Sequence, residues 1–169
     1  LSNGSIYSSK VQNYQTPIYL QVNSVLNATL INLTRDVNLG GFDLALNVTR
    51  ANGTAVAFGQ RIDGAGNLTA NAGLNSIVLS GVVGGIARLS STNLTGCITV
   101  NGNISTVGDQ IYSGNVLVGS GIFMNSTLGN IMVTGDLDSI PYLSNMLLYL
   151  DSTNISSYSG LGSTWYDLS

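Results

Sequence analysis

The stretch IDGAGNLTANAGLNSIVLSGVVGGIARLSSTNLTG, residues 62–96, decides the fold class of this chain. Short apolar runs such as SIVLSGVV at 76–83 alternate in it with glycines and asparagines, and no long polar loop separates them. Runs of strand length bounded by such residues are typical of β-strands. Glycine accepts the positive φ angles of tight bends, so its recurrence at strand ends indicates the corners of a parallel coil. The stretch therefore predicts a β-solenoid.

Comparable runs recur over most of the 169 residues, at a spacing that is typical of a sandwich, a barrel or a solenoid. Only 8% of the residues are charged. The chain contains one lysine, Lys10, and no glutamate, so the residues that stabilise exposed helices are nearly missing. We expect an all-β fold with parallel β-helix or solenoid-like repeats. A β-sandwich or jelly-roll packing is the alternative, especially in the N-terminal third. The runs lie at 17–34, 42–49, 54–62, 67–72, 76–83, 87–91, 97–102, 109–119, 121–125, 130–137 and 145–151.

The central part of the chain resembles a known family. The phrases in Gly64 to Gly73, Val83 to Gly96 and Ile104 to Gly119, the last with GDQIYSG, are similar to the β-strand repeats of filamentous-haemagglutinin-like surface proteins. This resemblance covers about residues 62–124 and implies a right-handed parallel β-helix that serves as a stalk or fibre. The chain departs from the family at Cys97, where a small or polar residue is usual, and residues 1–60 hold no clear copy of the repeat.

The end of the chain resembles a second family. MLLYLDSTNISSYSGLGSTWYDLS, residues 146–169, is similar to the first strand of a laminin-G/concanavalin-like jelly-roll domain. The resemblance implies that 141–169 hold a linker and the first strand of a truncated jelly-roll-like domain. We therefore expect a β segment at 1–60 with an assembly strand at 17–34, solenoid-like repeats at 61–140, and this last piece. Pro17 and Pro141 are expected to mark the edges of the strand-rich block, because proline cannot donate to a ladder.

Glycosylation signals are more frequent than composition alone explains. The chain contains 19 asparagines and 35 serines and threonines, which in random order give about four Asn-X-Ser/Thr sequons. Ten occur, and sequons in surface loops of secreted proteins are N-glycosylation sites. The alternative is β-turn chemistry, with asparagine in a left-handed position before a strand, as in GNLTA around Asn67. The sequon asparagines are Asn3, Asn27, Asn32, Asn47, Asn52, Asn67, Asn93, Asn103, Asn125 and Asn154.

The sequence offers few groups for catalysis or metal binding. No histidine or glutamate is present, so Ser-His-Asp and Cys-His arrangements are excluded, and one cysteine is too few for a zinc site. Asp136 and Asp138 stand two apart on a predicted strand and are candidates for a glycosidase pair, with a solvated turn as the alternative. We expect no enzyme activity, no cofactor and no metal. Cys97 is expected to be a small buried hydrophobic residue.

These observations favour a building or binding role. Five scattered basic residues cannot neutralise a nucleic-acid backbone, and no apolar run reaches the 18 residues of a membrane span. We expect a glycosylated structural subunit of an extracellular, cell-surface or virion-surface fibre that assembles through strand edges. Its partners would be copies of itself, neighbouring surface proteins or glycans. The alternative is an adhesin or carbohydrate-binding stalk protein.

Overall fold

The computed structural model describes residues 4–49 and 52–139, and all secondary structure in them is β. Asn3, Pro141, Asn154 and the jelly-roll-like stretch 146–169 lie outside the described residues. The strands are β1 (Ser5–Tyr7), β2 (Val11–Tyr14), β3 (Ile18–Tyr19), β4 (Ser24–Ala28), β5 (Leu30–Leu33), β6 (Val37–Asn38), β7 (Leu44–Val48), β8 (Thr54–Phe58), β9 (Ile62–Asp63), β10 (Asn67–Leu79), β11 (Ser91–Val100), β12 (Ile104–Thr106), β13 (Gln110–Ser113), β14 (Val116–Val118), β15 (Met124–Ser126), β16 (Ile131–Val133) and β17 (Leu137–Ser139).

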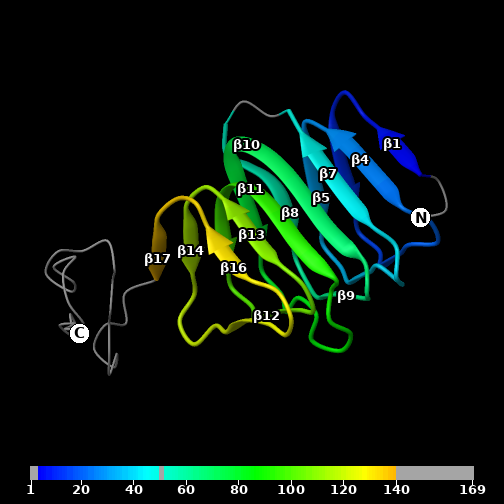
Figure 1. Cartoon of the computed structure of the whole chain (residues 1–169). Helices are drawn as coiled ribbons and strands as arrows, with labels where there is room; N and C mark the ends of the chain where they lie inside the picture. The colour runs from blue at the N-terminus through cyan, green and yellow to red at the C-terminus, as the bar shows by residue number, and fades with distance from the viewer. Residues whose placement is uncertain (1–3, 50–51, 140–169) are drawn as a thin grey trace, which may run out of the picture. The chain divides into compact units, whose positions relative to one another are not determined.

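The described strands form a parallel β-solenoid of about six turns (Figure 1). The first face consists of β1, β4, β7, the first part of β10, the first part of β11, β13 and β16. The second face consists of β2, β5, β8, the later parts of β10 and β11, β14 and β17. The third face consists of β3, β6 and β9, an isolated bridge at Val83, and then β12 and β15. The expectation of a solenoid is thereby confirmed.

The coils stack in register, so residues about one turn apart form columns. On the third face Ile18, Val37, Ile62, Val83 and Ile104 follow one another in direct pairing. All but Ile18 are at most 2% exposed. Each such residue removes apolar surface from water, which stabilises the fold by about 1.5–3 kcal/mol for a fully buried aliphatic side chain. The core is therefore one continuous column of apolar side chains inside the coils.

The N-terminal third belongs to the same solenoid. β8 pairs with β10 and β7 pairs with β10, so the ladders run across the expected boundary at residue 60. The expected assembly strand at 17–34 forms β3, β4 and β5, in which Leu26 and Ile31 are fully buried. This segment is part of the core, because both neighbouring coils already pair with β4 and β5.

Glycines make the corner between the first and second faces. Gly96 and Gly114 have φ angles of 145° and 136°, and a Cβ on Gly114 would collide with the carbonyl oxygen of Gly96 in the coil before it. All nine described residues with positive φ are glycines. The expected left-handed asparagine is therefore wrong for Asn67, whose side chain instead bonds across coils. Asparagine has a Cβ and pays for that conformation, whereas glycine does not.

The expected burial of Cys97 is also wrong, because the cysteine is exposed. Side chains alternate along β11, and Leu94, Ile98 and Val100 point inward. With a period of two residues, position 97 must then point outward. Strand parity outweighs the usual tendency of a free cysteine to be buried.

Candidate functional site

Asparagine and aspartate side chains connect successive coils at the corner that precedes the first face. The backbone N–H of Asp43 donates to Oδ1 of Asn23 over 2.9 Å, and the N–H of Asn67 donates to Oδ1 of Asp43 over 2.9 Å. The Oγ of Ser91 donates to Oδ1 of Asn67 over 2.7 Å. Later in the same column the N–H of Asn130 donates to Oδ1 of Asp109 over 2.8 Å. We call this row of corner residues, Asn23, Asp43, Asn67, Ser91, Asp109 and Asn130, the Asx column.

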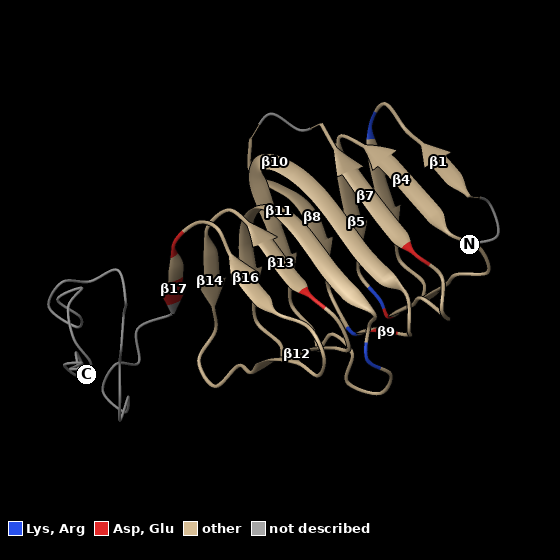
Figure 2. Cartoon of the chain, in the orientation of Figure 1, with Lys and Arg blue, Asp and Glu red and all other residues tan. Residues whose placement is uncertain are grey.

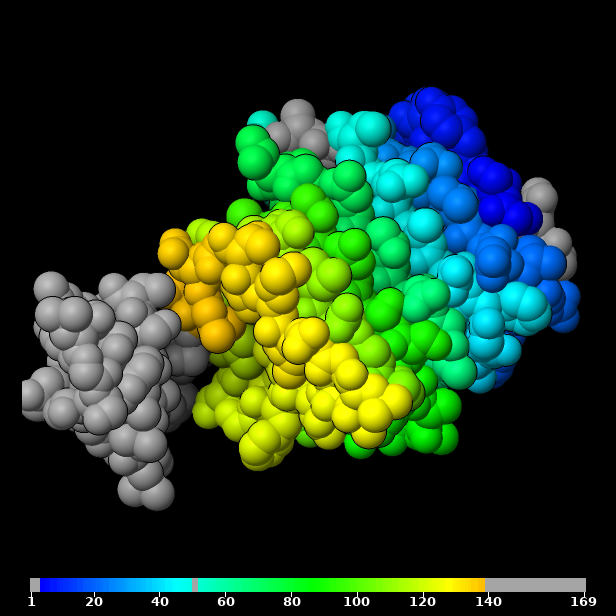
Figure 3. Space-filling view, in the orientation of Figure 1, coloured from blue at the N-terminus to red at the C-terminus, as the bar shows by residue number. Residues whose placement is uncertain are grey.

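A shallow groove lies beside the Asx column on the outer side of the first face, which Figure 3 shows from the front. Its volume is about 470 Å³. Its floor is made by outward residues of β7, β10, β11 and β13, and its rim by the Asx column. The groove is lined by Asp43, Leu44, Ala45, Asn67, Thr69, Ser91, Thr92, Asn93, Asp109 and Ile111.

The groove offers hydrogen-bonding groups together with the carboxylates of Asp43 and Asp109. Oδ1 of Asp43 already accepts two hydrogen bonds from Asn67, and Oδ1 of Asp109 accepts one from Asn130. The remaining polar groups of the lining are hydroxyls and amides, which suit a polyhydroxylated ligand. The described residues contain no group of three or more metal-ligating His, Cys, Asp or Glu side chains.

The sequence-derived carboxylate candidates lie elsewhere. Asp136 and Asp138 flank Leu137 in the terminal strand β17 and are both exposed. The backbone N–H of Asp136 donates to Oδ1 of Asn115 over 3.1 Å, a bond between coils at the corner between the first and second faces. Neither residue lines the groove.

Eight of the ten sequon asparagines lie in the described part of the chain. Asn67 is committed to its neighbours, since its Nδ2 donates to Asp43 over 2.9 Å and its Oδ1 accepts from Ser91. Asn47 and Asn27 stand side by side in register on β7 and β4. Asn47, Asn52, Asn93, Asn103 and Asn125 are exposed, and Asn27, Asn32 and Asn67 are half-buried.

Two Gln-X-Tyr pairs, one buried and one partly buried, were missed by the sequence reasoning. In β13 the Tyr112 hydroxyl donates to Oε1 of Gln110 over 2.9 Å, and Nε2 of Gln110 donates to the carbonyl of Asn125 over 2.8 Å. In β2 the Tyr14 hydroxyl donates to Oε1 of Gln12 over 3.1 Å. Burial raises the pKa of Tyr112 far above its usual range, with a smaller opposing effect of the Thr92 hydroxyl. The Gln-X-Tyr pattern that VQNY and DQIY share could have indicated these pairs from the sequence.

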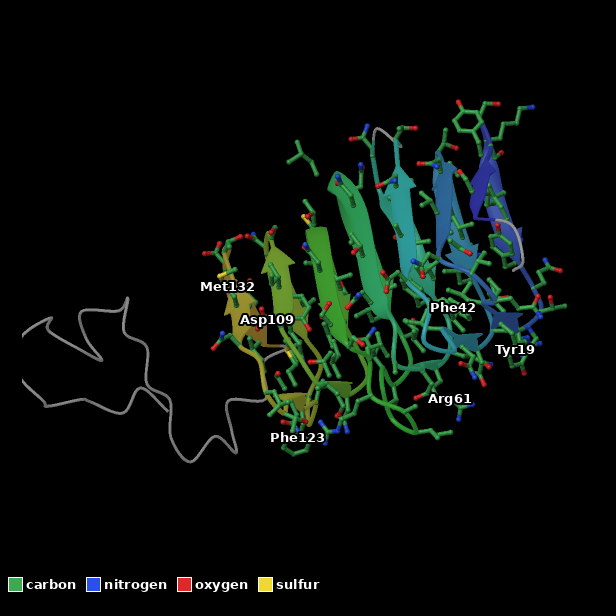
Figure 4. All side chains as sticks on the ribbon, turned by 45° about the vertical axis from the view of Figure 1, so that its right-hand side comes forward. Tyr19, Phe42, Arg61, Asp109, Phe123 and Met132 are labelled. Atoms are coloured by element: carbon green, nitrogen blue, oxygen red, sulfur yellow. The ribbon has the colours of Figure 1, made fainter. Side chains whose placement is uncertain are left out.

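Arg61, Asp36 and Asp63 form an ion-pair cluster on the third face, next to the loop at residues 84–88. Arg61 is labelled in Figure 4. Nη2 of Arg61 lies 2.8 Å from Oδ2 of Asp36, and Nε of Arg61 lies 2.6 Å from Oδ2 of Asp63. Asp63 is buried, and its Oδ1 accepts the N–H groups of Ile86 and Ala87 over 2.9 and 3.2 Å. These bonds hold the 84–88 loop against β9, so the cluster has a structural role.

Both ends of the described solenoid carry strands with one neighbour. Within residues 4–49 and 52–139, β1, β2 and β3 pair only with β4, β5 and β6, and β16 and β17 pair only with β13 and β14. Tyr7 and Val11 at the first end are 78% and 54% exposed. At the other end Asp136 and Asp138 point outward, so the alternation of side chains along a strand directs Leu137 toward the core. Leu137 is nevertheless 59% exposed.

Comparison with protein-family models, curated proteins and solved structures gives no match to this chain. Among the described residues no helix is long and apolar enough to pass through a membrane. The groove, the sequons and the two strand-edged ends are therefore the features on which a functional proposal rests.

Proposed function

We propose that this chain is a non-enzymatic structural subunit of an extracellular or virion-surface fibre, and that copies of it assemble through strand edges. The observation that carries the proposal is the pair of ends at which the strands, among the residues that the structure describes, pair on one side only. An unpaired strand edge is a template for another chain. In a solenoid each coil contacts only its neighbours, so adding a coil from another copy repeats contacts that already exist along the axis.

The positions of the described sequons agree with this role. They run from Asn27 in β4 to Asn125 in β15, and none lies in the first coil, residues 4–19, or in the last coil, residues 130–139. Glycans on these asparagines would cover the sides of the solenoid, whereas the sequon at Asn3, next to the first coil, lies outside the described residues. They would also keep a weakly charged surface soluble, which fits a secreted or surface-displayed protein.

The test is to express the full chain in a host that secretes and N-glycosylates it, and then to follow its assembly. Sedimentation velocity over a range of concentrations, together with negative-stain electron microscopy, should detect unbranched filaments. A protein that stays monomeric at every concentration would contradict the proposal.

An adhesin or carbohydrate-binding stalk is the second candidate, and the groove beside the Asx column favours it. Hydroxyl and amide groups from Thr69, Asn93 and Ser91 line a surface that a sugar chain fits chemically. Ala45 lies at its floor with its side chain outward, so Ala45→Trp fills the groove without entering the core. Binding on a glycan array that is lost in Ala45→Trp, with unfolding unchanged, would support this candidate.

A further inference from the structure

We propose that the copies add end to end, with the first coil of one copy, residues 4–19, stacked on the last coil of the next, residues 130–139. The register places Val11 of the incoming copy over Asp136 and Gln12 over Leu137. This inference rests on the proposed fibre function and adds to it the identity of the partner surface and the register of the joint.

The register follows from the columns inside one chain. On the second face Gln12, Ile31, Val56, Ile77, Ile98 and Val116 pair in succession. The N–H of Ile98 donates to the carbonyl of Asn115, and the N–H of Val116 donates in the same way to the carbonyl of Asp136. Leu137 is therefore the next member of the column that Gln12 begins, and a further coil would place a residue equivalent to Gln12 over it.

The corner bonding supplies an acceptor at the last coil. Within the chain, the N–H of Asp136 donates to Oδ1 of Asn115 in the coil before it. The same step repeated once more needs an N–H from the following coil aimed at the Asp136 carboxylate. In the proposed register the residue that provides this N–H is Val11.

The first coil points the matching donor outward. The carbonyl of Lys10 accepts a hydrogen bond from the N–H of Thr29 over 3.0 Å, so it points toward the second coil. The described chain has no cis peptide bonds, and a trans peptide directs its N–H opposite to its carbonyl. The N–H of Val11 therefore points out of the open end, where an incoming carboxylate can accept it.

Charge also matches across the joint. Lys10, at the corner after β1, and Asp136 and Asp138, at β17, are all exposed. Figure 2 shows basic segments in blue and acidic segments in red along the ribbon. In the proposed register Lys10 lies one residue from the position over Asp136. A bond between an ionised carboxylate and a backbone N–H, flanked by an ammonium group, is stronger than a neutral one.

The same end is protected against unselective pairing. Lys10 and Pro17 both lie on the first coil, and lysine and proline are residues that natural sheet edges use to discourage aggregation. Pro17 occupies the position equivalent to Phe123, whose N–H donates to Asn103 over 2.9 Å, so the third face cannot repeat that bond. The contacts between the two copies are therefore made by the first and second faces. A partner must place an acidic residue opposite Lys10.

A contact between two different ends of the molecule leaves a free end at each terminus of the growing assembly, and such a contact produces open filaments when the rotation does not close a ring. The charge pair predicts a specific pattern in mixing experiments. Lys10→Asp alone faces Asp136 of its neighbour, and Asp136→Lys alone faces Lys10. In a mixture of the two variants every joint again unites opposite charges.

The experiment uses the secreted full chain and three variants, Lys10→Asp, Asp136→Lys and the control Arg88→Asp, which reverses an exposed charge in the 84–88 loop. We expect each end variant to raise the concentration needed for filaments at least tenfold. An equimolar mixture of the two end variants should restore assembly. Arg88→Asp should assemble like the parent. If the parent assembles and the end variants assemble equally well, the register is contradicted while the fibre proposal stands. If the parent forms no assembly, the fibre proposal itself is contradicted.

A second measurement examines the register and the other occupants of the last coil. Asn13→Cys and Asp138→Cys, together with Cys97→Ser, place two thiols on adjacent rows of the proposed joint, and a short bifunctional thiol reagent should yield a ladder of covalent oligomers. Each single-cysteine control should yield dimers at most. In the monomeric protein the Leu137 amide should exchange rapidly with solvent. Slow exchange there would show that residues 140–169 of the same chain cover the last coil, which contradicts the proposal.

Discussion

Asn47 stands in register beside Asn27 on neighbouring strands, and its Nδ2 donates a hydrogen bond to Oδ1 of Asn27 over 3.1 Å. Both asparagines belong to sequons. Neighbouring parallel strands are about 4.8 Å apart, which is less than the width of one sugar ring with its hydration. We therefore expect two glycans not to fit side by side at this spacing.

The first prediction is that folded, secreted chains carry at most one glycan on the Asn27 and Asn47 pair. Asn47 should be the carrier, because it is exposed whereas Asn27 is half-buried. Glycopeptide mass spectrometry of a fragment that contains both sites measures this, with the exposed Asn125 as a reference site. A major population with both sites occupied would contradict the prediction.

The second prediction concerns Asn67, whose amide bonds Asp43 and Ser91 across three coils. Asn67→Ala removes both side-chain hydrogen bonds, while the backbone N–H of residue 67 still donates to Asp43, and it should lower the free energy of unfolding by about 1 kcal/mol. Asn93→Ala removes an exposed sequon asparagine from the neighbouring coil and should change the free energy by less than about 0.5 kcal/mol. Urea titrations of the unglycosylated proteins provide the comparison, and equal effects would count against the Asx column as a structural feature.

The third prediction separates steric collision from backbone strain. Gly114→Ala places a Cβ against the carbonyl of Gly96, and its φ of 136° is strained for alanine. Gly121→Ala has a φ of 71° but open space around the new atom. The control should cost about 1–2 kcal/mol from strain alone. Gly114→Ala should cost at least about 2 kcal/mol more, since coil stacking must open to admit the methyl group.

The fourth prediction is a loss of stability at high pH. Burial raises the pKa of Tyr112 above its ordinary value of 10.0, so between that value and its folded pKa the phenol is ionised only in the unfolded chain. The folded state then binds more protons, and the free energy of unfolding falls as pH rises above about 10. Below that pH the contribution of the neutral phenol is fully present.

Tyr112→Phe tests this effect. The variant should be less stable near neutral pH by about 1–3 kcal/mol, because Oε1 of Gln110 loses its donor inside the core. Its stability should fall less steeply above about pH 10 than that of the parent. The remaining fall is expected from Tyr14, whose pKa burial also raises. Parallel pH profiles for the two proteins would contradict the assignment.

Local sequence pattern predicted the strands better than their arrangement. SIVLSGVV and CITVNG indicated strands because their apolar residues and bounding glycines lie within a few positions. The alternation of Ile98 and Val100 also predicts an outward Cys97, whereas the residue type alone predicts a buried one. The three faces could not be predicted from the sequence, because residues that pair between neighbouring coils are separated by uneven numbers of residues. Ala45 pairs with Thr69, and Thr92 pairs with Gln110.

The site was harder to predict for the same reason. The carboxylates of Asp43 and Asp109 lie on one column only after the coils stack, and no local motif links them. The sequence contains the sequons, but the neighbouring coil determines the environment of each asparagine. Asn93 is exposed, whereas the side chain of Asn67 is hydrogen-bonded to Asp43. Contacts between coils, rather than propensities within them, determine these properties.

Fibre diffraction from oriented filaments of the secreted full chain tests the central claim most directly. If solenoids stack end to end, the strands lie across the fibre and the coil spacing lies along it. The pattern should then contain a strong reflection at about 4.8 Å on the meridian. Filaments whose 4.8 Å reflection lies on the equator, or a protein that forms no filaments, would contradict the account.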